Sequence, residues 1–376
     1  MRRASDGERR RLSETFQTLC RIESPSRHER ECADWVTAEL RSLGLEVEED
    51  DAGTRVASTT GNLLTRIAGR GDGSLLLCAH LDTVPLTAPV EPVIVDGGWE
   101  NANDGILGAD NKSAVAILIE LARRLVSDPP EVSVELLFTI CEEISLQGSK
   151  EFDAGKLRSN FGYVFDHATP IGEIVVASPS HQRLVAEMRG RAAHAGVRPE
   201  AGRSAIAAVA QAVAAMRLGR LDEETTANVG TIAGGTAINV IPEQCRIEAE
   251  VRSVDEEKLQ TALTDMIDRL QDAANASECD VDVTVERMFE GYRTRPRAPH
   301  VVLAERALQT CGYVPKHIAS GGASDANSLN AIGFPCTNLA DGSERNHQPD
   351  ERISVDALEG MFEVAIALVE EARHGI

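Results

Sequence analysis

Two apolar segments separated by a helical segment constrain the fold of this chain more than any other feature. Residues 75–79 (LLLCA) and 132–140 (VSVELLFTI) are short apolar runs that are typical of buried strands. The segment 113–125 between them is rich in Ala, Ile and Leu and is expected to be a helix. A strand, a helix and a second strand in this order predict parallel strands joined by a helix that packs on the sheet. We therefore expect an α/β protein with a mostly parallel sheet and helices on both faces.

The pattern of elements changes near residue 179. The expected elements that follow are strands and helices in alternation, at 184–188, 202–216, 245–251, 255–274 and 281–285. This order is typical of a ferredoxin-like α+β unit of the split βαβ type. The α/β pattern resumes from about residue 291. We therefore predict a discontinuous first domain, 1–178 and 291–376, and an inserted domain at 179–290.

Length, charge and cysteine spacing limit the class of protein. A chain of 376 residues exceeds one compact core, which agrees with two domains. Sixty acidic against 38 basic side chains give a formal charge of −22, so neither nucleic acid nor a membrane surface is an expected partner. No segment approaches the ~20 apolar residues of a membrane span. The eight cysteines include no C-x-x-C pair, so we expect a cytoplasmic protein with reduced, mostly buried thiols.

The segment 26–29 (SRHE) has the form of a capping box. It precedes an apolar pattern that contains Trp35 and Leu40 and ends at Gly44. This pattern predicts that Ser26 and Glu29 cap the start of a helix.

His80 and Asp82 directly follow the first apolar strand. Residues two positions apart on a strand share a face, so this imidazole and this carboxylate can touch. A metal-bound histidine commonly donates its other ring N–H to a carboxylate. The pair is therefore a candidate for a metal ligand and the residue that orients it, although the motif alone is weak.

Acidic residues also follow other expected strands. Asp110 precedes the helix at the carboxyl side of the sheet, either as a ligand or as an ordinary helix cap. Glu142 and Glu143 come directly after the second strand, where one can bind a metal while the other holds water; the alternative is a surface charge pair. Asp166 closes a further apolar strand, and His347 lies far downstream.

Together these positions form a set of two imidazoles and three carboxylates. Such a mixed set of nitrogen and oxygen ligands suits Zn²⁺ and also accepts Mn²⁺ or Co²⁺. Five ligands suit two metals, and a shared aspartate would bridge ions ~3.5 to 4 Å apart. A pair of ions at that spacing can activate one hydroxide and polarise one carbonyl. The five candidate ligands are His80, Asp110, Glu143, Asp166 and His347.

The order of the motifs resembles that of the M20 metallopeptidases, and most closely their peptidase T-like branch. The resemblance covers almost the whole chain and implies a dinuclear zinc-exopeptidase fold with an inserted lid domain. The matching segments are 79–84 (AHLDTV), 106–112 (ILGADNK), 141–143 (CEE), 165–166 (FD), 191–196 (RAAHAG) and 320–327 (SGGASDAN).

The resemblance implies a role for each candidate ligand. His80 and Asp166 would bind one metal, and Glu143 and His347 would bind the other. Asp110 would bridge the two metals. Asp166 stands where other branches carry glutamate, which is typical of the aminopeptidases and dipeptidases of the family and not of its deacylases.

The resemblance also implies roles for neighbouring groups. Asp82 would orient His80, and Glu142 would be the general base that takes a proton from the metal-bound water. A cis peptide would fall at Asp110-Asn111. His167 departs from the small residue expected after the aspartate; it is either a polar loop residue or a group that lines the cleft or competes as a ligand.

Four residues are expected to contact substrate by resemblance to the family. His194 in the lid would bind the substrate carbonyl or oxyanion, from the partner subunit in dimeric members. Asn239 and Arg252 would contact the substrate carbonyl and carboxylate, and Gly322 would let backbone N–H groups approach the ligand. The alternatives are a surface imidazole for His194, a surface ion pair for Arg252 and a plain turn for Gly322. The other histidines, His28, His181, His300, His317 and His374, are expected at the surface or in linkers.

The resemblance predicts a cytoplasmic exopeptidase that removes the N-terminal residue of short peptides. A water that bridges two divalent metals, zinc in the first place and manganese or cobalt as alternatives, would be the nucleophile. A homodimer through the lid domain is compatible with the family. Two alternatives stay open: an N-acyl or carbamoyl amino acid amidohydrolase with the same site, and a peptide-binding homologue without catalysis.

Overall fold

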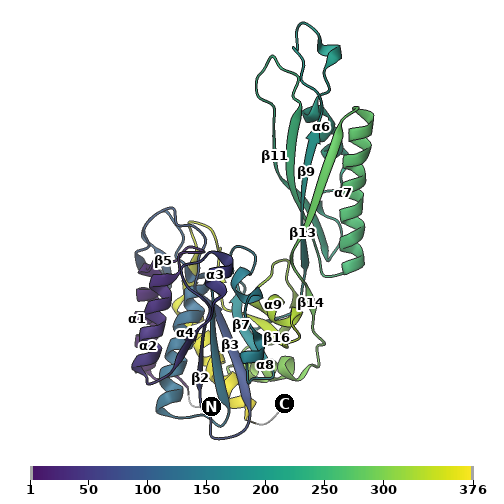
Figure 1. The fold of residues 1–376 in the computed structure, drawn as a ribbon. Coiled ribbons are helices and arrows are strands. Elements are labelled where there is room, and N and C mark those ends of the chain that lie inside the picture. The colour runs from purple at the N-terminus through teal and green to yellow at the C-terminus, as the bar shows by residue number, and fades with distance from the viewer. Residues whose placement is uncertain (1–2, 374–376) are drawn as a thin grey trace. The chain divides into compact units, whose positions relative to one another are not determined.

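The computed structural model describes residues 3–373 and divides the chain into two compact units (Figure 1). The first unit consists of the segments up to Val176, Thr294–Ala319 and from Ala323 onward. The second unit consists of Ala177–Arg293 and Ser320–Gly322. Each unit encloses its own hydrophobic core. Most of the second unit is thus a single insertion, Ala177–Arg293, between two segments of the first.

Most of a nine-stranded sheet lies in the first unit. Its order is β1-β2-β6-β3-β7-β16-β8-β14, and β15 pairs with β8. The inner pairs β6–β3, β3–β7 and β7–β16 are parallel, whereas β2 and β8 join this core in antiparallel orientation. The predicted mostly parallel sheet is therefore confirmed. The strands are β1 (Val47–Glu49), β2 (Leu63–Ile67), β3 (Ser74–His80), β6 (Ser133–Thr139), β7 (Gly162–His167), β8 (Glu173–Ser178), β14 (Tyr292–Arg293), β15 (Lys316–Ala319) and β16 (Cys336–Ala340).

Helices cover this sheet on both faces. Residues 75–80 of β3 and 134–139 of β6 are all buried. Because successive side chains of a strand point to opposite faces of the sheet, both faces must be covered here. Helices α4 and α10 contact β3, and α8 and α9 contact β16. The helices of this unit are α1 (Asp6–Arg21), α2 (Arg30–Ser42), α3 (Ala52–Val56), α4 (Ala109–Ser127), α5 (Gln147–Lys150), α8 (Pro299–Thr310), α9 (Asp325–Ala331) and α10 (Val355–Ala372), with a 3-10 turn at Ala154–Lys156.

A small antiparallel sheet in the first unit has the order β17-β18-β5-β4. Its short strands are β4 (Pro92–Val95), β5 (Gly98–Asn101), β17 (Ser343–Glu344) and β18 (Arg352–Ser354). The loop between β17 and β18 carries His347. This sheet, which the sequence pattern did not predict, therefore anchors both ends of that loop.

The second unit is an antiparallel sheet with two helices. The order β11-β12-β9-β13, with β10 at the edge, is that of a ferredoxin-like unit, as predicted. Burial alternates along β12, which shows that one face is covered, and α6 and α7 contact this sheet (Figure 1). The elements are β9 (Ser180–Arg189), α6 (Ala205–Ala215), β10 (Gly219–Arg220), β11 (Thr225–Gly234), β12 (Gln244–Ser253), α7 (Glu256–Ala276) and β13 (Asp280–Phe289), with a 3-10 turn at Pro199–Ala201.

The predicted capping box at 26–29 is wrong. Helix α2 begins at Arg30, and Glu29 makes no side-chain bond to cap it. The Ser26 hydroxyl instead donates to the carboxylate of Asp82, at 2.6 Å. Glu29 is fully buried and accepts the Cys141 backbone N–H at 3.1 Å. Both side chains therefore make long-range contacts beside the ends of β3 and β6.

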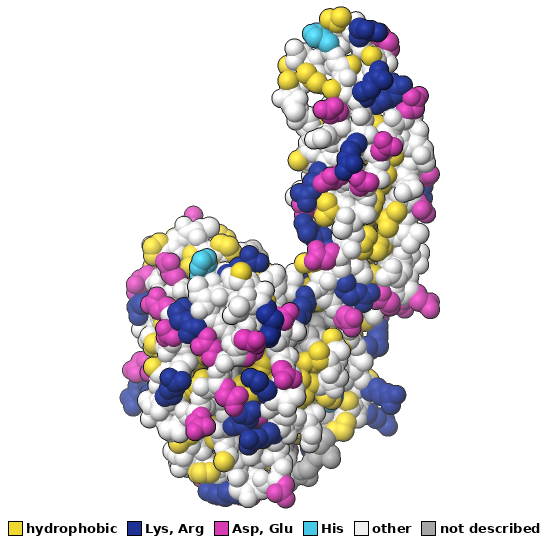
Figure 2. All heavy atoms as spheres, viewed as in Figure 1, with side chains coloured by type: hydrophobic (Ala, Val, Ile, Leu, Met, Phe, Trp, Pro, Cys, Tyr) yellow, Lys and Arg dark blue, Asp and Glu magenta, His cyan; other side chains and the backbone are white. Residues whose placement is uncertain are grey.

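The cysteines agree with the sequence prediction, whereas two histidines do not. All eight cysteines are free thiols; six are buried and two are half-buried. His181 and His300 are buried, contrary to the expected surface position, and His374 lies outside the described residues. Within residues 3–373, no helix combines the length and the apolar character that crossing a bilayer requires. On the face shown in Figure 2, acidic and basic side chains are interspersed.

Candidate metal centre

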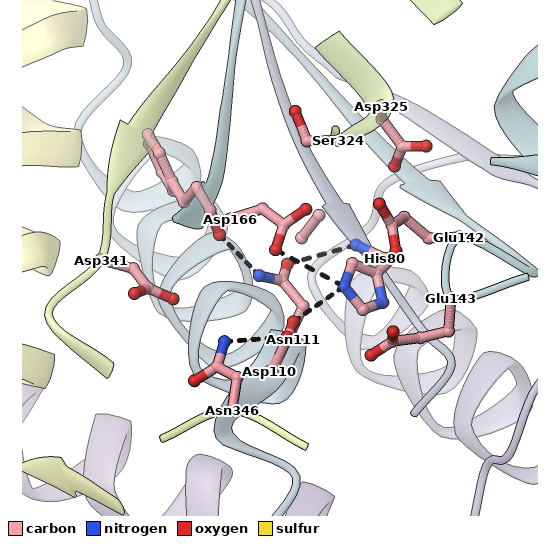
Figure 3. Close-up of polar contacts among 12 residues, drawn as sticks. His80, Asp110, Asn111, Glu142, Glu143, Asp166, Ser324, Asp325, Asp341 and Asn346 are labelled. Carbon is pink, nitrogen blue, oxygen red and sulfur yellow. Dashed lines mark hydrogen bonds and ion pairs between the residues drawn. The ribbon is translucent and has the colours of Figure 1, made fainter. Parts of the chain in front are cut away.

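The candidate ligands converge because adjacent parallel strands end at the same edge of the sheet. His80 is the last residue of β3, which lies between β6 and β7. Glu142 and Glu143 follow β6, and Asp166 lies near the end of β7. Asp110 comes from the start of α4. Figure 3 shows the carboxylates of these acidic residues around the imidazole of His80.

The carboxylate of Asp110 lies between two imidazoles. Its Oδ1 is 3.0 Å from His80 Nε2, and its Oδ2 is 3.3 Å from His347 Nε2. Asn346 donates to the same Oδ2 at 2.8 Å. Asp110 itself has non-helical backbone angles, and both its carboxylate oxygens meet side chains of other segments, which does not fit the ordinary helix cap that was the alternative. The Asp110-Asn111 peptide is cis, as the resemblance implied.

Each imidazole also meets a second carboxylate. His80 Nε2 lies 3.8 Å from Asp166 Oδ1, and His347 Nε2 lies 3.0 Å from Glu143 Oε1. Ligand atoms on a tetrahedral zinc ion, at about 2.0 to 2.1 Å from the metal, lie roughly 3.3 Å apart. Two three-residue groups, which share Asp110, thus have spacings suitable for metal ligands, with all ligand atoms of a group within 4.8 Å. These groups contain the five ligands predicted from the sequence.

Glu142 belongs to a third such group, with His80 and Glu143. It is buried, and its backbone N–H donates to Asp82 Oδ1 at 2.9 Å. The N–H of Glu143 donates to Asp82 Oδ2 at 3.2 Å. The Asp82 carboxylate therefore holds the backbone of both glutamates.

The orientation of His80 differs in one respect from the expectation. Its Nδ1 lies 2.9 Å from the main-chain carbonyl oxygen of Asp82, within hydrogen-bond distance, and 3.5 Å from the carboxylate. The main chain of Asp82, and not the side chain, thus makes the hydrogen bond to the imidazole. The carboxylate of Asp82 already accepts three other hydrogen bonds, from the Ser26 hydroxyl and from the backbone N–H groups of Glu142 and Glu143.

The electrostatics of the centre favour positive charge. Burial raises the pKa of Glu142 well above its usual range, and the negative charge of Asp166 raises it further. Burial and the charge of Asp110 likewise raise the pKa of Asp166 and of Glu143. Hydrogen bonds to Asp110 and Glu143 raise the pKa of His347 to about 10. Because the buried carboxylates outnumber the imidazoles, divalent cations would relieve their repulsion.

Several supporting residues gave no sequence signal of their own. Asn111 donates to the Phe165 carbonyl at 2.6 Å and so ties the start of α4 to β7. Thr139 donates to the carboxylate of Asp325 at 2.5 Å, next to Glu142 in Figure 3. Asn111 and Asp325 lie within the family motifs at 106–112 and 320–327, and only this position could have marked them as supporting residues. His167, whose pKa burial lowers, is in none of the three ligand groups found among residues 3–373.

Comparison with known proteins identifies the family. Residues 178–278 match the peptidase dimerisation domain of the M20 family, and residues 62–197 match peptidase family M28. The crystal structure of aminopeptidase PepT from Bacillus cereus ATCC 10987 is 36% identical, with a TM-score of 0.89 over 96% of this chain and 98% of that chain. The chain belongs to the peptidase T-like M20 peptidases. Members of this family are metallopeptidases, and so is this protein.

Two further relatives of this M20 peptidase cover almost its whole length. The structure of a tripeptidase from Staphylococcus aureus subsp. aureus Mu50 is 30% identical, with a TM-score of 0.93 over 97% of this chain and 99% of that chain. The uncharacterized protein YqjE of Bacillus subtilis is 34% identical over 365 residues, which are 96% of this chain and 98% of that protein. The relationship therefore extends across both units.

The four expected substrate contacts of this M20 peptidase lie in the second unit. The segments of His194 and Asn239 are side by side, because the Ala195 N–H donates to the Asn239 carbonyl at 2.9 Å. Both side chains are exposed. Arg252 donates to Glu250 at 3.1 Å, so the ion pair considered as an alternative is present. Gly322, also in this unit, accepts a hydrogen bond from the Ser178 hydroxyl at 2.8 Å.

Proposed function

We propose that this M20 metallopeptidase is a two-metal aminopeptidase that removes the N-terminal residue of short peptides, tripeptides above all. One observation carries the proposal: each oxygen of the Asp110 carboxylate faces a different imidazole, which is the arrangement that a bridging ligand needs. The relatives named aminopeptidase PepT and tripeptidase support the substrate class.

The proposed ligands form two sets around Asp110. His80 and Asp166 would hold one ion, and Glu143 and His347 would hold the other. The nitrogen and carboxylate donors fit Zn²⁺ and accept Mn²⁺ or Co²⁺. Two such ions, when bound, polarise the scissile carbonyl and lower the pKa of water.

Glu142 is the proposed general base. Its carboxylate would take a proton from the attacking water and later deliver one to the leaving amine. The hydrogen bond of its N–H to Asp82 supports this role, because it fixes the backbone from which the side chain projects. Burial of the side chain keeps bulk water from competing for the proton. His194, Asn239, Arg252 and Gly322 remain proposed contacts for the substrate.

Metal analysis together with a substrate panel tests the proposal. The panel contains free tripeptides, the same tripeptides with an acetylated N-terminus, and N-acetyl and N-carbamoyl amino acids. We expect close to two equivalents of divalent metal per chain and release of the N-terminal residue from free tripeptides alone. Turnover of N-acyl or N-carbamoyl amino acids without peptide cleavage would establish the amidohydrolase instead. Tight peptide binding without product would establish a binding protein.

A further inference from the structure

A buried carboxylate from outside the predicted ligand set holds the segment that carries Asp110. Glu351 lies in the turn before β18 and is 2% exposed. Its Oε2 accepts the backbone N–H groups of Leu107 and Gly108, at 2.9 and 2.8 Å. Its Oε1 accepts the N–H of Asp110 at 2.9 Å. The Glu351 carboxylate thus accepts three backbone hydrogen bonds from the four-residue segment 107–110.

These donors lie in irregular backbone before the regular turns of α4. Asp110 and Asn111 have non-helical backbone angles within α4, so this stretch of main chain is not held by a regular helical hydrogen-bond ladder. The carboxylate of Glu351 supplies acceptors for these N–H groups from more than 240 positions away in the sequence. The main chain at Asp110 is therefore fixed independently of the contacts of its side chain.

Glu351 belongs to the same loop as another candidate ligand. His347 precedes it by four residues, and Asn346 of that loop donates to Asp110 Oδ2 at 2.8 Å. The loop is itself fixed, because the Glu351 N–H donates to the Gln348 carbonyl at 3.0 Å and β18 follows at once. Asp110 is thus held by its main chain through Glu351 and by its carboxylate through Asn346.

We propose that Glu351 is a positioning residue of the metal centre. It ties the segment of Asp110 to the loop of His347, so that ligands for both ions are set at their spacing before metal binds. The inference rests on the proposed function, since it concerns the same centre. It predicts that loss of Glu351 weakens metal binding although no atom of Glu351 is a proposed ligand.

The substitution Glu351→Gln tests the role with little change in volume. A glutamine keeps one acceptor oxygen, so whichever way its amide turns, its NH₂ group faces at least one backbone N–H. The favoured orientation directs the oxygen to Leu107 and Gly108 and leaves the N–H of Asp110 unpaired. Removal of a group that orients a metal ligand typically lowers metal affinity about 10- to 100-fold.

Glu135 offers a matched control. It is also buried, and its Oε2 accepts the backbone N–H groups of Arg158 and Ser159 at 3.0 and 2.8 Å. It lies near the start of β6, whereas the metal ligands follow the end of that strand. Its Oε1 also accepts from the Arg66 guanidinium at 2.9 Å, so Glu135→Gln should reduce stability at least as much as Glu351→Gln without touching the centre.

The experiment titrates Zn²⁺ and Mn²⁺, each alone, into the chelator-treated full chain and its two variants, by calorimetry and by competition with a metal indicator. We expect Glu351→Gln to lose about 10- to 100-fold in affinity for at least one ion, and Glu135→Gln to bind as the unsubstituted chain does. Equal affinity in Glu351→Gln, or an equal loss in Glu135→Gln, would overturn the inference alone. No stoichiometric metal binding by the unsubstituted chain would overturn the proposed function as well.

A second measurement needs no variant and applies if Glu351→Gln does not fold. Hydrogen exchange of the metal-free chain reports directly on the amides of Leu107, Gly108 and Asp110. We expect these amides to exchange slowly before any metal is added, because their acceptor is in place. Fast exchange that slows only after Zn²⁺ is added would overturn the inference.

Discussion

Replacement of Asp82 by Asn separates two roles of this residue: its side chain holds the backbone of Glu142, and its main chain orients His80. The Asp82 carboxylate accepts from Glu142, Glu143 and Ser26, whereas its main-chain carbonyl accepts from His80. An asparagine keeps one oxygen, which would stay with the two donors at Oδ2. Its NH₂ group would then face the Glu142 N–H. The hydrogen bond to the main-chain carbonyl of Asp82 is unaffected.

The magnitude follows from the one bond that is lost. A buried hydrogen bond to a charged group contributes about 1.5 to 3 kcal/mol. If the whole loss appears in the positioning of Glu142, kcat falls roughly 10- to 160-fold. Metal affinity should stay near that of the unsubstituted chain, because His80 keeps its orientation.

The assay measures kcat on a free tripeptide and the metal content of the same sample. Ser26→Ala is the matched control: it removes one donor from the same carboxylate and leaves the Glu142 N–H bonded, so kcat should change much less. A loss of metal from Asp82→Asn that parallels its loss of kcat would refute the reasoning. It would mean that the carboxylate, 3.5 Å from His80 Nδ1, orients the imidazole after all.

Three further outcomes follow from the same geometry. Glu142→Gln should retain both metals while kcat falls at least ~10²-fold, as measured by metal analysis and steady-state kinetics. Chelation should lower the thermal midpoint, and Zn²⁺ at about 100 times its Kd should restore roughly 2.7 kcal/mol per site, which calorimetry measures. Burial raises the pKa of Asp341 to about 7, so the metal-free native state prefers the protonated form. Asp341→Asn should therefore gain stability over the unsubstituted chain as pH rises from about 4 to 7, by ~4 kcal/mol at most. A difference in urea midpoint between the two chains that is the same at pH 4 and pH 7.5 would contradict this.

The parts of the centre that sequence could predict are those next to strongly apolar strands. His80, Glu142 and Asp166 each stand at the end of such a run, and parallel strands bring their carboxyl ends to one edge. His347 has no such neighbour, since it lies between two very short strands. Its residue type alone made it a candidate ligand, and its role in the second metal set came from the resemblance and not from the local pattern.

The parts that sequence missed depend on contacts between distant segments. The Ser26 and Glu29 pattern fits a helix cap, but both side chains bond to residues more than 50 positions away. Glu351 is one glutamate among many, and its partners are backbone N–H groups, which no residue type marks. Strand β11 was missed because Thr, Ala and Gly give its sequence (TTANVGTIAG) a weak apolar pattern.

The place of β16 in the sheet has a consequence for synthesis on the ribosome. Strands β7 and β8 follow one another in the chain, yet β16 lies between them and pairs with both. A nascent chain that has completed β8 must therefore leave a gap one strand wide until residue 340 has been translated. At about 5 to 20 residues per second this takes roughly 8 to 30 seconds, during which the inserted unit can already fold. Until then, the backbone groups of β7 and β8 that face β16 lack their native partners.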